Sequence, residues 1–271
     1  MDILFLKAAL VVYLISSLGY ICSLYVKRVL VAKVSTWILF LALILHTIFF
    51  LFRYVKTGQT PIISLYETLS FFAWAMTGIY LALQLKTKTR ILGAFVSPMT
   101  FLLMIAASPG LGGHVFLPDI LQSNLVPVHV FFTVTGEALF ALASCAGVMY
   151  LIQEGLIKNK KMSGFIRILP SLTDLDRINH MCLMWGFPLL TLGVLVGSIW
   201  ARTAWGSLWQ WDPKQVWALT AWLAYALLLH QRLAIGWKGR KAALFSILAF
   251  TLLLASLIII NLFFVTAHTF I

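Results

Sequence analysis

The fold of this chain is decided by stretches such as VSTWILFLALILHTIFFLF, residues 34–52, which contain no Asp, Glu, Lys or Arg. A helix needs about 20 mostly apolar residues to cross the hydrocarbon core of a bilayer. Similar runs occupy residues 3–25, 63–85, 91–107, 127–152, 181–200, 214–231 and 242–266. We therefore predict an all-α, polytopic membrane helical bundle with about eight transmembrane helices.

The composition agrees with this prediction and excludes other classes of protein. Of the 271 residues, 62% are hydrophobic and 10% are charged, whereas a soluble domain is ~45–50% apolar and ~25% charged. The runs also lack the strict alternation of a membrane β-barrel. No linker separates soluble modules, so we predict one integral membrane domain over 1–271. The three cysteines form no C-x-x-C motif, which argues against a redox-active dithiol or covalently attached haem.

The net charge of +12 indicates membrane orientation and not a nucleic-acid partner. Of the 20 Lys and Arg residues, 15 lie in the odd-numbered loops, near 27–33, 86–90, 158–177 and 232–241. The even-numbered loops contain only Arg53, Lys56, Arg202 and Lys214. Because basic residues accumulate on the cytoplasmic side, both termini and the even-numbered loops are predicted to be extracytoplasmic.

The sixth loop and its flanks are unusually rich in tryptophan. They read WARTAWGSLWQWDPKQVW over 200–217, and six of the ten tryptophans lie between 200 and 222. Tryptophan favours both membrane interfaces, but such a belt accounts for only one or two residues per helix end. Four tryptophans fall within thirteen residues here: Trp205, Trp209, Trp211 and Trp217.

Two stretches predict where helices begin. Asp212 followed by Pro213 is typical of an N-cap with proline at the first helical position, and Gln215 completes a capping-box pattern. The seventh helix is therefore expected to start here. In the fifth loop, residues 169–177 predict a short surface helix with no catalytic signature.

If the tryptophan-rich segment is helical, Trp205 and Trp209 are i,i+4 neighbours. The indoles would then form a flat shelf on the outer membrane surface, with Arg202 and Lys214 at its edges. Such a shelf suits a large planar apolar ligand that carries carboxylates. Haem has that shape.

The segment resembles the WWD signature of haem-handling proteins of cytochrome c biogenesis, and it is most similar to the CcsA (ResC) family. Five further short segments resemble sequences of the family: Val128–Val130, Gly136–Phe140, Leu169–Leu172, Gly186–Gly193 and Gly236–Arg240. The resemblance is strong over roughly 125–271 and weaker in the part of the chain before it, where Leu65–Glu67 is the most similar segment. The chain departs from the family at Gln215, where Glu is more usual, and at Arg202–Thr203, where Asn-Glu is common.

The resemblance implies a protein that moves haem b across the membrane, non-covalently, and presents it for covalent attachment to the C-x-x-C-H motif of apocytochrome c. It implies a CcsB (ResB)-like membrane subunit as partner in a cytochrome c synthase, located in the bacterial cytoplasmic membrane with its working face outside. The tryptophan segment, with Asp212, would hold the macrocycle, and Arg202 or Lys214 would meet a propionate. No catalytic acid or base is expected, because thiols and vinyl groups react once they are positioned.

Three histidines are the candidate iron ligands. Topology places His129 at the outer start of the fifth helix and His268 at the outer end of the eighth. From position alone each is more readily a polar anchor, but the resemblance implies that they are the two axial ligands of the outer haem. His230, near the inner end of the seventh helix, has the position of a snorkelling residue. The resemblance makes it a ligand of a second, inner haem whose opposite ligand comes from the partner.

The remaining ionisable residues have alternative roles. His46 lies within an apolar run, where an ionisable group is either functional or hydrogen-bonded inside the bundle. Glu67 and Glu137 suggest a proton relay or structural hydrogen bonds, and we favour the structural role. His114 and His180 are predicted as loop and interfacial residues.

Two other functions fit the sequence. One is a haem exporter or chaperone of the CcmC type, which binds haem at a similar loop without ligation. The other is a membrane regulator resembling HemX, which shares the fold but usually lacks the full tryptophan motif. A b-type quinol oxidoreductase is disfavoured, because it needs two pairs of buried histidines and only one outward pair is visible.

Overall fold

A computed structural model of the chain describes residues 2–26, 28–62, 64–87, 89–111, 121–160 and 169–263. Within these ranges every regular element is helical. The α-helices are α1 (Asp2–Val26), α2 (Val29–Thr57), α3 (Leu65–Thr87), α4 (Gly93–Ala107), α5 (Leu125–Lys158), α6 (Leu172–Trp205), α7 (Pro213–Leu233) and α8 (Arg240–Phe263). Short 3₁₀ helices, Arg90–Leu92 and Ser108–Gly110, flank α4. The all-α prediction is confirmed, and each predicted run corresponds to one helix.

Six segments of the described chain are long and apolar enough to cross a membrane. They are α1, α2, α3, Arg90–Gly110, α5 and α6. The chain is thus a polytopic membrane protein. α7 and α8 match the last two predicted runs in position, and their crossing stays a prediction, as does the extracytoplasmic placement of both termini.

α5 and α6 extend well past their apolar runs. Each has 34 residues, about 50 Å of helix, whereas the hydrocarbon core is about 30 Å thick. The separate surface helix predicted near 169–177 is wrong, because residues from Leu172 onward form the first turns of α6. The Asp174 N–H donates to the Ser171 hydroxyl (3.1 Å), which donates to the Asp174 carboxylate (2.6 Å). These hydrogen bonds therefore mark the start of a longer sixth helix and not of a separate one.

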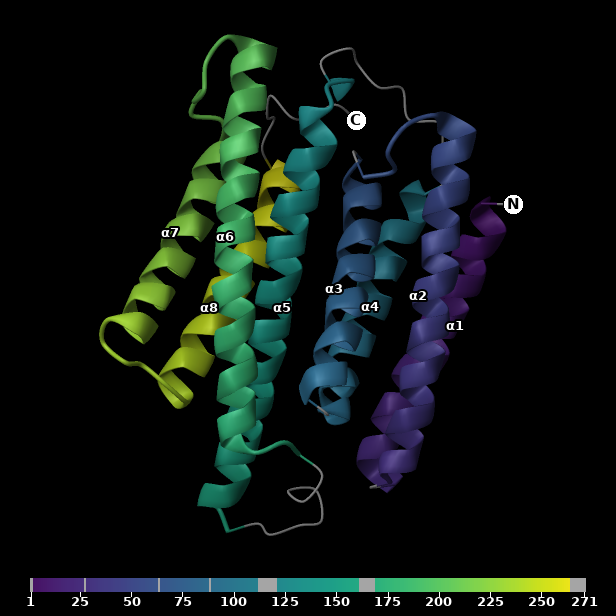
Figure 1. Cartoon of the computed structure of the whole chain (residues 1–271), viewed down its shortest axis with the longest axis vertical. Coiled ribbons are helices and arrows are strands. Elements are labelled where there is room, and N and C mark those ends of the chain that lie inside the picture. The colour runs from purple at the N-terminus through teal and green to yellow at the C-terminus, as the bar shows by residue number, and fades with distance from the viewer. Residues whose placement is uncertain are drawn as a thin grey trace. The chain divides into compact units, whose positions relative to one another are not determined.

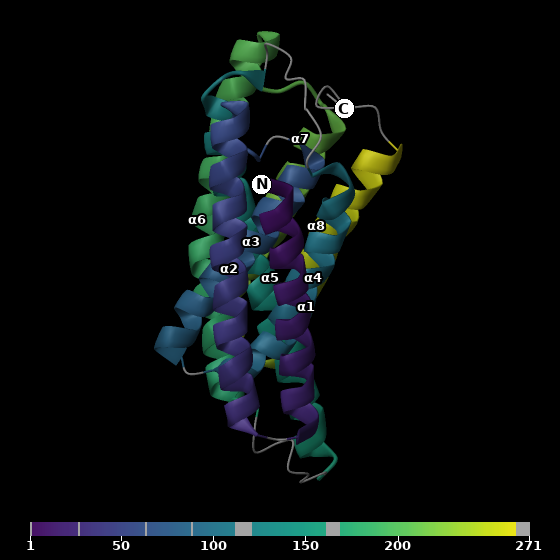
Figure 2. The same ribbon diagram turned by 90° about the vertical axis from the view of Figure 1, so that its right-hand side faces the viewer.

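The chain groups into two compact units, Met1–His114 with Met149–Leu175 (unit 1) and Val115–Val148 with Asp176–Ile271 (unit 2). In unit 1, α1 and α2 lie side by side and antiparallel (Figures 1 and 2). α1 turns Tyr13, Ser17 and Tyr20 inward and leaves Leu4 and Leu18 exposed. This arrangement suits a bilayer, because polar groups pair inside the bundle while apolar side chains meet lipid.

His46 is fully buried in this polar interior of unit 1. Its Nδ1 lies 3.3 Å from the Tyr13 hydroxyl, and its Nε2 lies 2.9 Å from the Ser70 hydroxyl. Its ring stacks on Phe50, with 4.7 Å between the ring centroids. Both nitrogens are engaged, so hydrogen bonding inside the bundle is the role that the structure shows.

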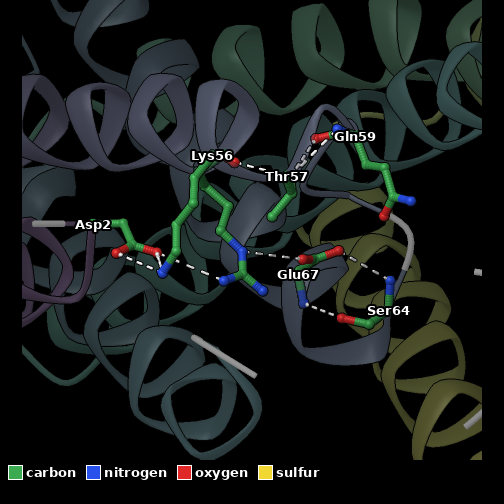
Figure 3. A network of polar contacts seen from close by, with 7 residues as sticks. Asp2, Lys56, Thr57, Gln59, Ser64 and Glu67 are labelled. Atoms are coloured by element: carbon green, nitrogen blue, oxygen red, sulfur yellow. Dashed lines mark hydrogen bonds and ion pairs between the residues drawn. The ribbon is translucent and has the colours of Figure 1, made fainter. Parts of the chain in front are cut away.

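An ion network, buried except for the half-exposed Lys56, joins the start of α1, the end of α2 and the start of α3 (Figure 3). Arg53 lies 3.6 Å from the Asp2 carboxylate and 3.9 Å from the Glu67 carboxylate, and Lys56 lies 3.4 Å from Asp2. Ser64 and Glu67 form a reciprocal capping box, with backbone-to-side-chain hydrogen bonds of 3.1 and 3.3 Å. The structural role favoured for Glu67 is therefore confirmed, and both basic residues of this loop have acidic partners.

Glycines allow the helices of unit 2 to pack closely. A Cβ atom added to Gly136 of α5 would lie 2.9 Å from the Gly186 carbonyl oxygen of α6. One added to Gly147 would lie 3.0 Å from the Ala243 carbonyl oxygen of α8. Small residues at such crossings let backbones approach and compensate for the lack of a hydrophobic driving force in lipid.

A polar cluster ties α6, α7 and α8 together at the end of unit 2 where α7 ends. Arg232 donates to the Asn179 side-chain oxygen and to the Asp176 carboxylate, each at 3.0 Å. The Gly239 N–H donates to the same carboxylate at 2.9 Å. The Asn179 amide also donates to the Ser246 hydroxyl at 2.8 Å. The cluster fixes where α7 ends and α8 begins.

Candidate functional site

The tryptophan-rich segment, residues 200–217, connects α6 to α7 at the end of unit 2 where α5 begins (Figure 1). Residues 206–212 are not helical, so Trp205 and Trp209 are not i,i+4 neighbours, contrary to the expectation. Gly206 has φ +77° and its N–H donates to the Arg202 carbonyl at 2.9 Å. A glycine in this left-handed conformation terminates a helix, which is why α6 stops before the segment does.

The indoles of this segment do not form one flat shelf. Trp205 meets Trp200 at 4.8 Å between centroids and 68° between planes, and Trp209 meets Trp211 at 5.6 Å and 85°. The expected plane is therefore replaced by two edge-to-face pairs. Trp211 is 78% exposed and has φ +57°, a conformation rare for a bulky residue and one that accumulates at functional sites. Trp217 is half-buried in the first turns of α7.

At the start of α7, the structure confirms the predicted Asp212 N-cap but not the predicted capping box with Gln215. Asp212 is the N-cap, its carboxylate accepts from the Lys214 N–H at 2.9 Å, and Pro213 is the first helical residue. The Gln215 side chain does not close a capping box on the cap itself. It accepts from the Gln210 N–H at 2.8 Å. Gln215 thus fastens the irregular loop to the helix that follows.

Positive charge flanks the indoles on both sides along the chain. Arg202 is exposed in the last turn of α6, and Lys214 is half-buried in the first turn of α7. The N-terminus of α7 adds the partial positive charge of unsatisfied backbone N–H groups. The segment therefore combines exposed aromatic surface with groups that attract carboxylates.

His129 lies near the start of α5, at the same end of unit 2 as the tryptophan segment (Figure 1). Its Nδ1 is 2.7 Å from the Gly193 carbonyl oxygen of α6. A carbonyl only accepts hydrogen bonds, so Nδ1 donates and Nε2 carries the free lone pair. Nε2 makes no hydrogen bond to any residue that the structure describes. This is the tautomer that a backbone carbonyl fixes in metal-binding histidines.

Two glycines of α6 form the surface on which the imidazole lies. A Cβ atom on Gly197 would lie 2.6 Å from Nδ1 and 2.7 Å from Cε1 of His129. A Cβ atom on Gly193 would lie 2.8 Å from the Thr133 backbone nitrogen. The Gly193-x-x-x-Gly197 spacing is a known signal for close helix packing, although neither glycine was among the predicted site residues.

The other predicted ligands are not brought to His129 within the described chain. His268 and His114 lie outside the described residues. His230 is exposed in the last turns of α7, at the opposite end of unit 2 (Figure 1). His180 is half-buried and its Nδ1 is a buried atom without a partner in the described ranges. Nor does the described part of the chain contain a group of three His, Cys, Asp or Glu side chains suited to a metal ion.

Residues 62–268 match the model of a family described as cytochrome C assembly protein. The cytochrome c biogenesis protein CcsA of Chlamydomonas reinhardtii is 36% identical over 220 residues, which cover 76% of this chain and 60% of that protein. CcsA of Pyropia yezoensis is 30% identical and covers 80% of this chain and 81% of its own length. CcsA of Prochlorococcus marinus is 29% identical and covers 90% and 84%, respectively. The chain thus spans about three-fifths of the Chlamydomonas protein and over four-fifths of the other two.

Proposed function

Because this chain belongs to the cytochrome c assembly protein family and is of the CcsA type, we propose that it carries haem b across the membrane and presents it to apocytochrome c. The observation that carries the proposal is the state of His129. Its Nδ1 donates to the Gly193 carbonyl at 2.7 Å, which leaves Nε2 available to iron at the same end of unit 2 as the aromatic, positively flanked loop. These are the groups that an apolar macrocycle with an iron centre and two carboxylates requires.

In this proposal, His129 and His268 are the axial ligands of the outer haem. The exposed Trp211, with Trp205, Trp209 and Trp217, holds the macrocycle, and Asp212 caps the start of α7. Arg202 and Lys214 attract the propionates. Each cysteine thiol of the apocytochrome then adds its sulfur to one vinyl carbon and its hydrogen to the other, so the step needs positioning and no side-chain acid or base.

His230 supports a second part of the proposal, a partner subunit. Its side chain is exposed and makes no hydrogen bond to a described residue. A histidine so placed is suited to ligate an inner haem together with a ligand from a CcsB (ResB)-like subunit. The two chains together would form the cytochrome c synthase of the bacterial cytoplasmic membrane, with the tryptophan segment on the extracytoplasmic face.

The test is an absorption spectrum of the protein purified from haem-replete membranes. Wild type is expected to show a low-spin Soret band that the double variant His129→Ala/His268→Ala loses or weakens markedly. His114→Ala, at another predicted outer-loop histidine, serves as the control and should keep the band. A haem-free wild type, or an unchanged band in the double variant, would contradict the proposal.

A second experiment separates ligation from export alone. Co-expression with a CcsB-type subunit and an apocytochrome should yield covalently bound haem on the cytochrome, measured by its pyridine haemochrome spectrum. A haem exporter of the CcmC type would bind haem and give no thioether product.

A further inference from the structure

A second polar site lies inside unit 2, further along the helix that carries His129. Glu137 follows His129 by eight residues on α5, and with Thr133 between them the three side chains share one helix face. α5 is one of the membrane-crossing helices, where a carboxyl group is costly unless it is paired or functional. Glu137 makes no hydrogen bond to any residue in the described ranges. Its presence therefore requires an explanation.

Tyr225 of α7 lies beside this carboxyl group. Its ring stacks face to face on Phe140, with 3.5 Å between centroids and 8° between planes. Phe140 is one helical turn from Glu137 on α5, so this stacking places Tyr225 next to the turn of α5 that carries the carboxyl group. Tyr225 is 0% exposed, and its hydroxyl has no hydrogen-bond partner among the described residues.

A buried hydroxyl without a partner is rare in native structures and points to a group outside the described protein atoms. The surroundings restrict what that group is. On α6, Phe187 directly follows Gly186, and on α7, Trp222 lies one helical turn before Tyr225. The rings of Phe187 and Trp222 meet, with 5.3 Å between their centroids. Glu137 and the Tyr225 hydroxyl are therefore polar groups that lie next to aromatic side chains.

The position of the pair along unit 2 is also informative. Tyr225 precedes His230 by five residues on α7, and Glu137 follows His129 by eight residues on α5. Because His230 and the start of α5 lie at opposite ends of unit 2 (Figure 1), the pair lies between the two histidines that the proposed function assigns to the inner and outer haem.

We propose that Glu137 and Tyr225 form a binding station inside the membrane for a carboxylic acid group of an apolar macrocycle in transit, namely a haem propionate. The inference rests on the proposed function and adds an intermediate site to it. A propionate is the most polar part of haem and is the group that loses most on leaving water. The carboxyl group and the phenol together offer a donor and an acceptor to it, while the aromatic side chains contact the macrocycle.

The experiment compares Tyr225→Phe and Glu137→Leu with wild type. Tyr225→Phe removes only the hydroxyl and keeps the ring that stacks on Phe140. Tyr54→Phe is the matched control, because Tyr54 is 51% exposed in unit 1. Two quantities are measured for each purified protein: the haem that copurifies in a His129-dependent manner, and the affinity for haem added to the purified protein.

A defect in transit predicts a specific combination of results. Both variants should copurify with about fivefold less His129-dependent haem, the effect of losing one hydrogen bond, while they bind added haem with wild-type affinity. Unchanged copurified haem in both variants would overturn the inference and leave the proposed function intact. A loss of affinity for added haem as large as the loss of copurified haem would also overturn it, since that result indicates a structural role. A wild type without His129-dependent haem would overturn the proposed function and the inference with it.

Discussion

At the scale of single residues, the site depends on which atoms of α6 meet His129. The Gly193 carbonyl takes the Nδ1 proton at 2.7 Å, and Gly197 leaves the ring room to lie against the helix backbone. Neither glycine contributes a side chain. Both act by determining the tautomer and position of an imidazole that belongs to another helix.

Gly197→Ala tests this role directly. The added Cβ would lie 2.6 Å from Nδ1 of His129, so the ring must shift away from the Gly193 carbonyl. We expect haem affinity to fall about tenfold, as for other partners of metal-binding histidines, measured by titration of the purified protein with haem. Gly155→Ala, where a Cβ meets nothing within 4 Å, should bind as wild type. Equal affinity of the two variants would refute the role.

Trp211 offers a second test at this scale. Its φ of +57° is a conformation that glycine adopts without strain, and its exposed side chain contributes little to packing. Trp211→Gly should therefore unfold at or above the wild-type temperature while binding haem more weakly. Thermal unfolding and haem titration of the same preparation measure both effects. A clear loss of stability would show that the indole has a structural role.

At the scale of elements, the ends of α7 determine where the functional residues lie. Asp212 caps its start. Asp212→Ala should destabilise the protein by about 1 kcal/mol, seen as a lower midpoint of thermal unfolding in detergent, whereas Asp212→Asn should keep most of the stability. Similar midpoints for the two variants would indicate that the cap contributes nothing.

The other end of α7 is held by Arg232, whose side chain is 4% exposed and paired with Asp176. Arg232→Ala leaves the Asn179 side-chain oxygen without its donor, and it leaves the Asp176 carboxylate with only the Gly239 N–H. A loss of roughly 3 kcal/mol is expected from breaking a buried pair, measured by denaturant unfolding. Lys238→Ala, at an exposed position of the following loop, is the control and should change stability little.

At the scale of the whole molecule, orientation is the property to be tested. Ser207 and Asn159 are both exposed, in an even-numbered and an odd-numbered loop respectively. In a Cys22→Ser background, Ser207→Cys should react with a membrane-impermeant maleimide in intact cells, and Asn159→Cys only after permeabilisation. The reverse labelling pattern would invert the positive-inside assignment and place the tryptophan segment on the cytoplasmic face.

Much of the architecture was predictable because its causes are local. Apolar runs located all eight helices, although α6 begins nine residues before its run and α5 ends six residues after its own, and Asp212 with Pro213 marked the start of α7. Two local signals were missed, the Ser64-x-x-Glu67 capping box and the Gly193-x-x-x-Gly197 spacing. The flat indole shelf, which required a helical tryptophan segment, was wrong, because Gly206 ends α6 in the left-handed conformation.

The sequence by itself determined that this is a membrane bundle of a known family, since hydropathy, charge distribution and the sequences of the motifs are all properties of the linear chain. Only the tertiary structure decided what each polar group does. The Nδ1 of His129 meets a carbonyl 64 residues away, Glu67 meets Arg53, and the Tyr225 hydroxyl meets no described partner. Such pairings depend on which helix faces come together, and helix packing brings together residues whose separation along the chain carries no signal.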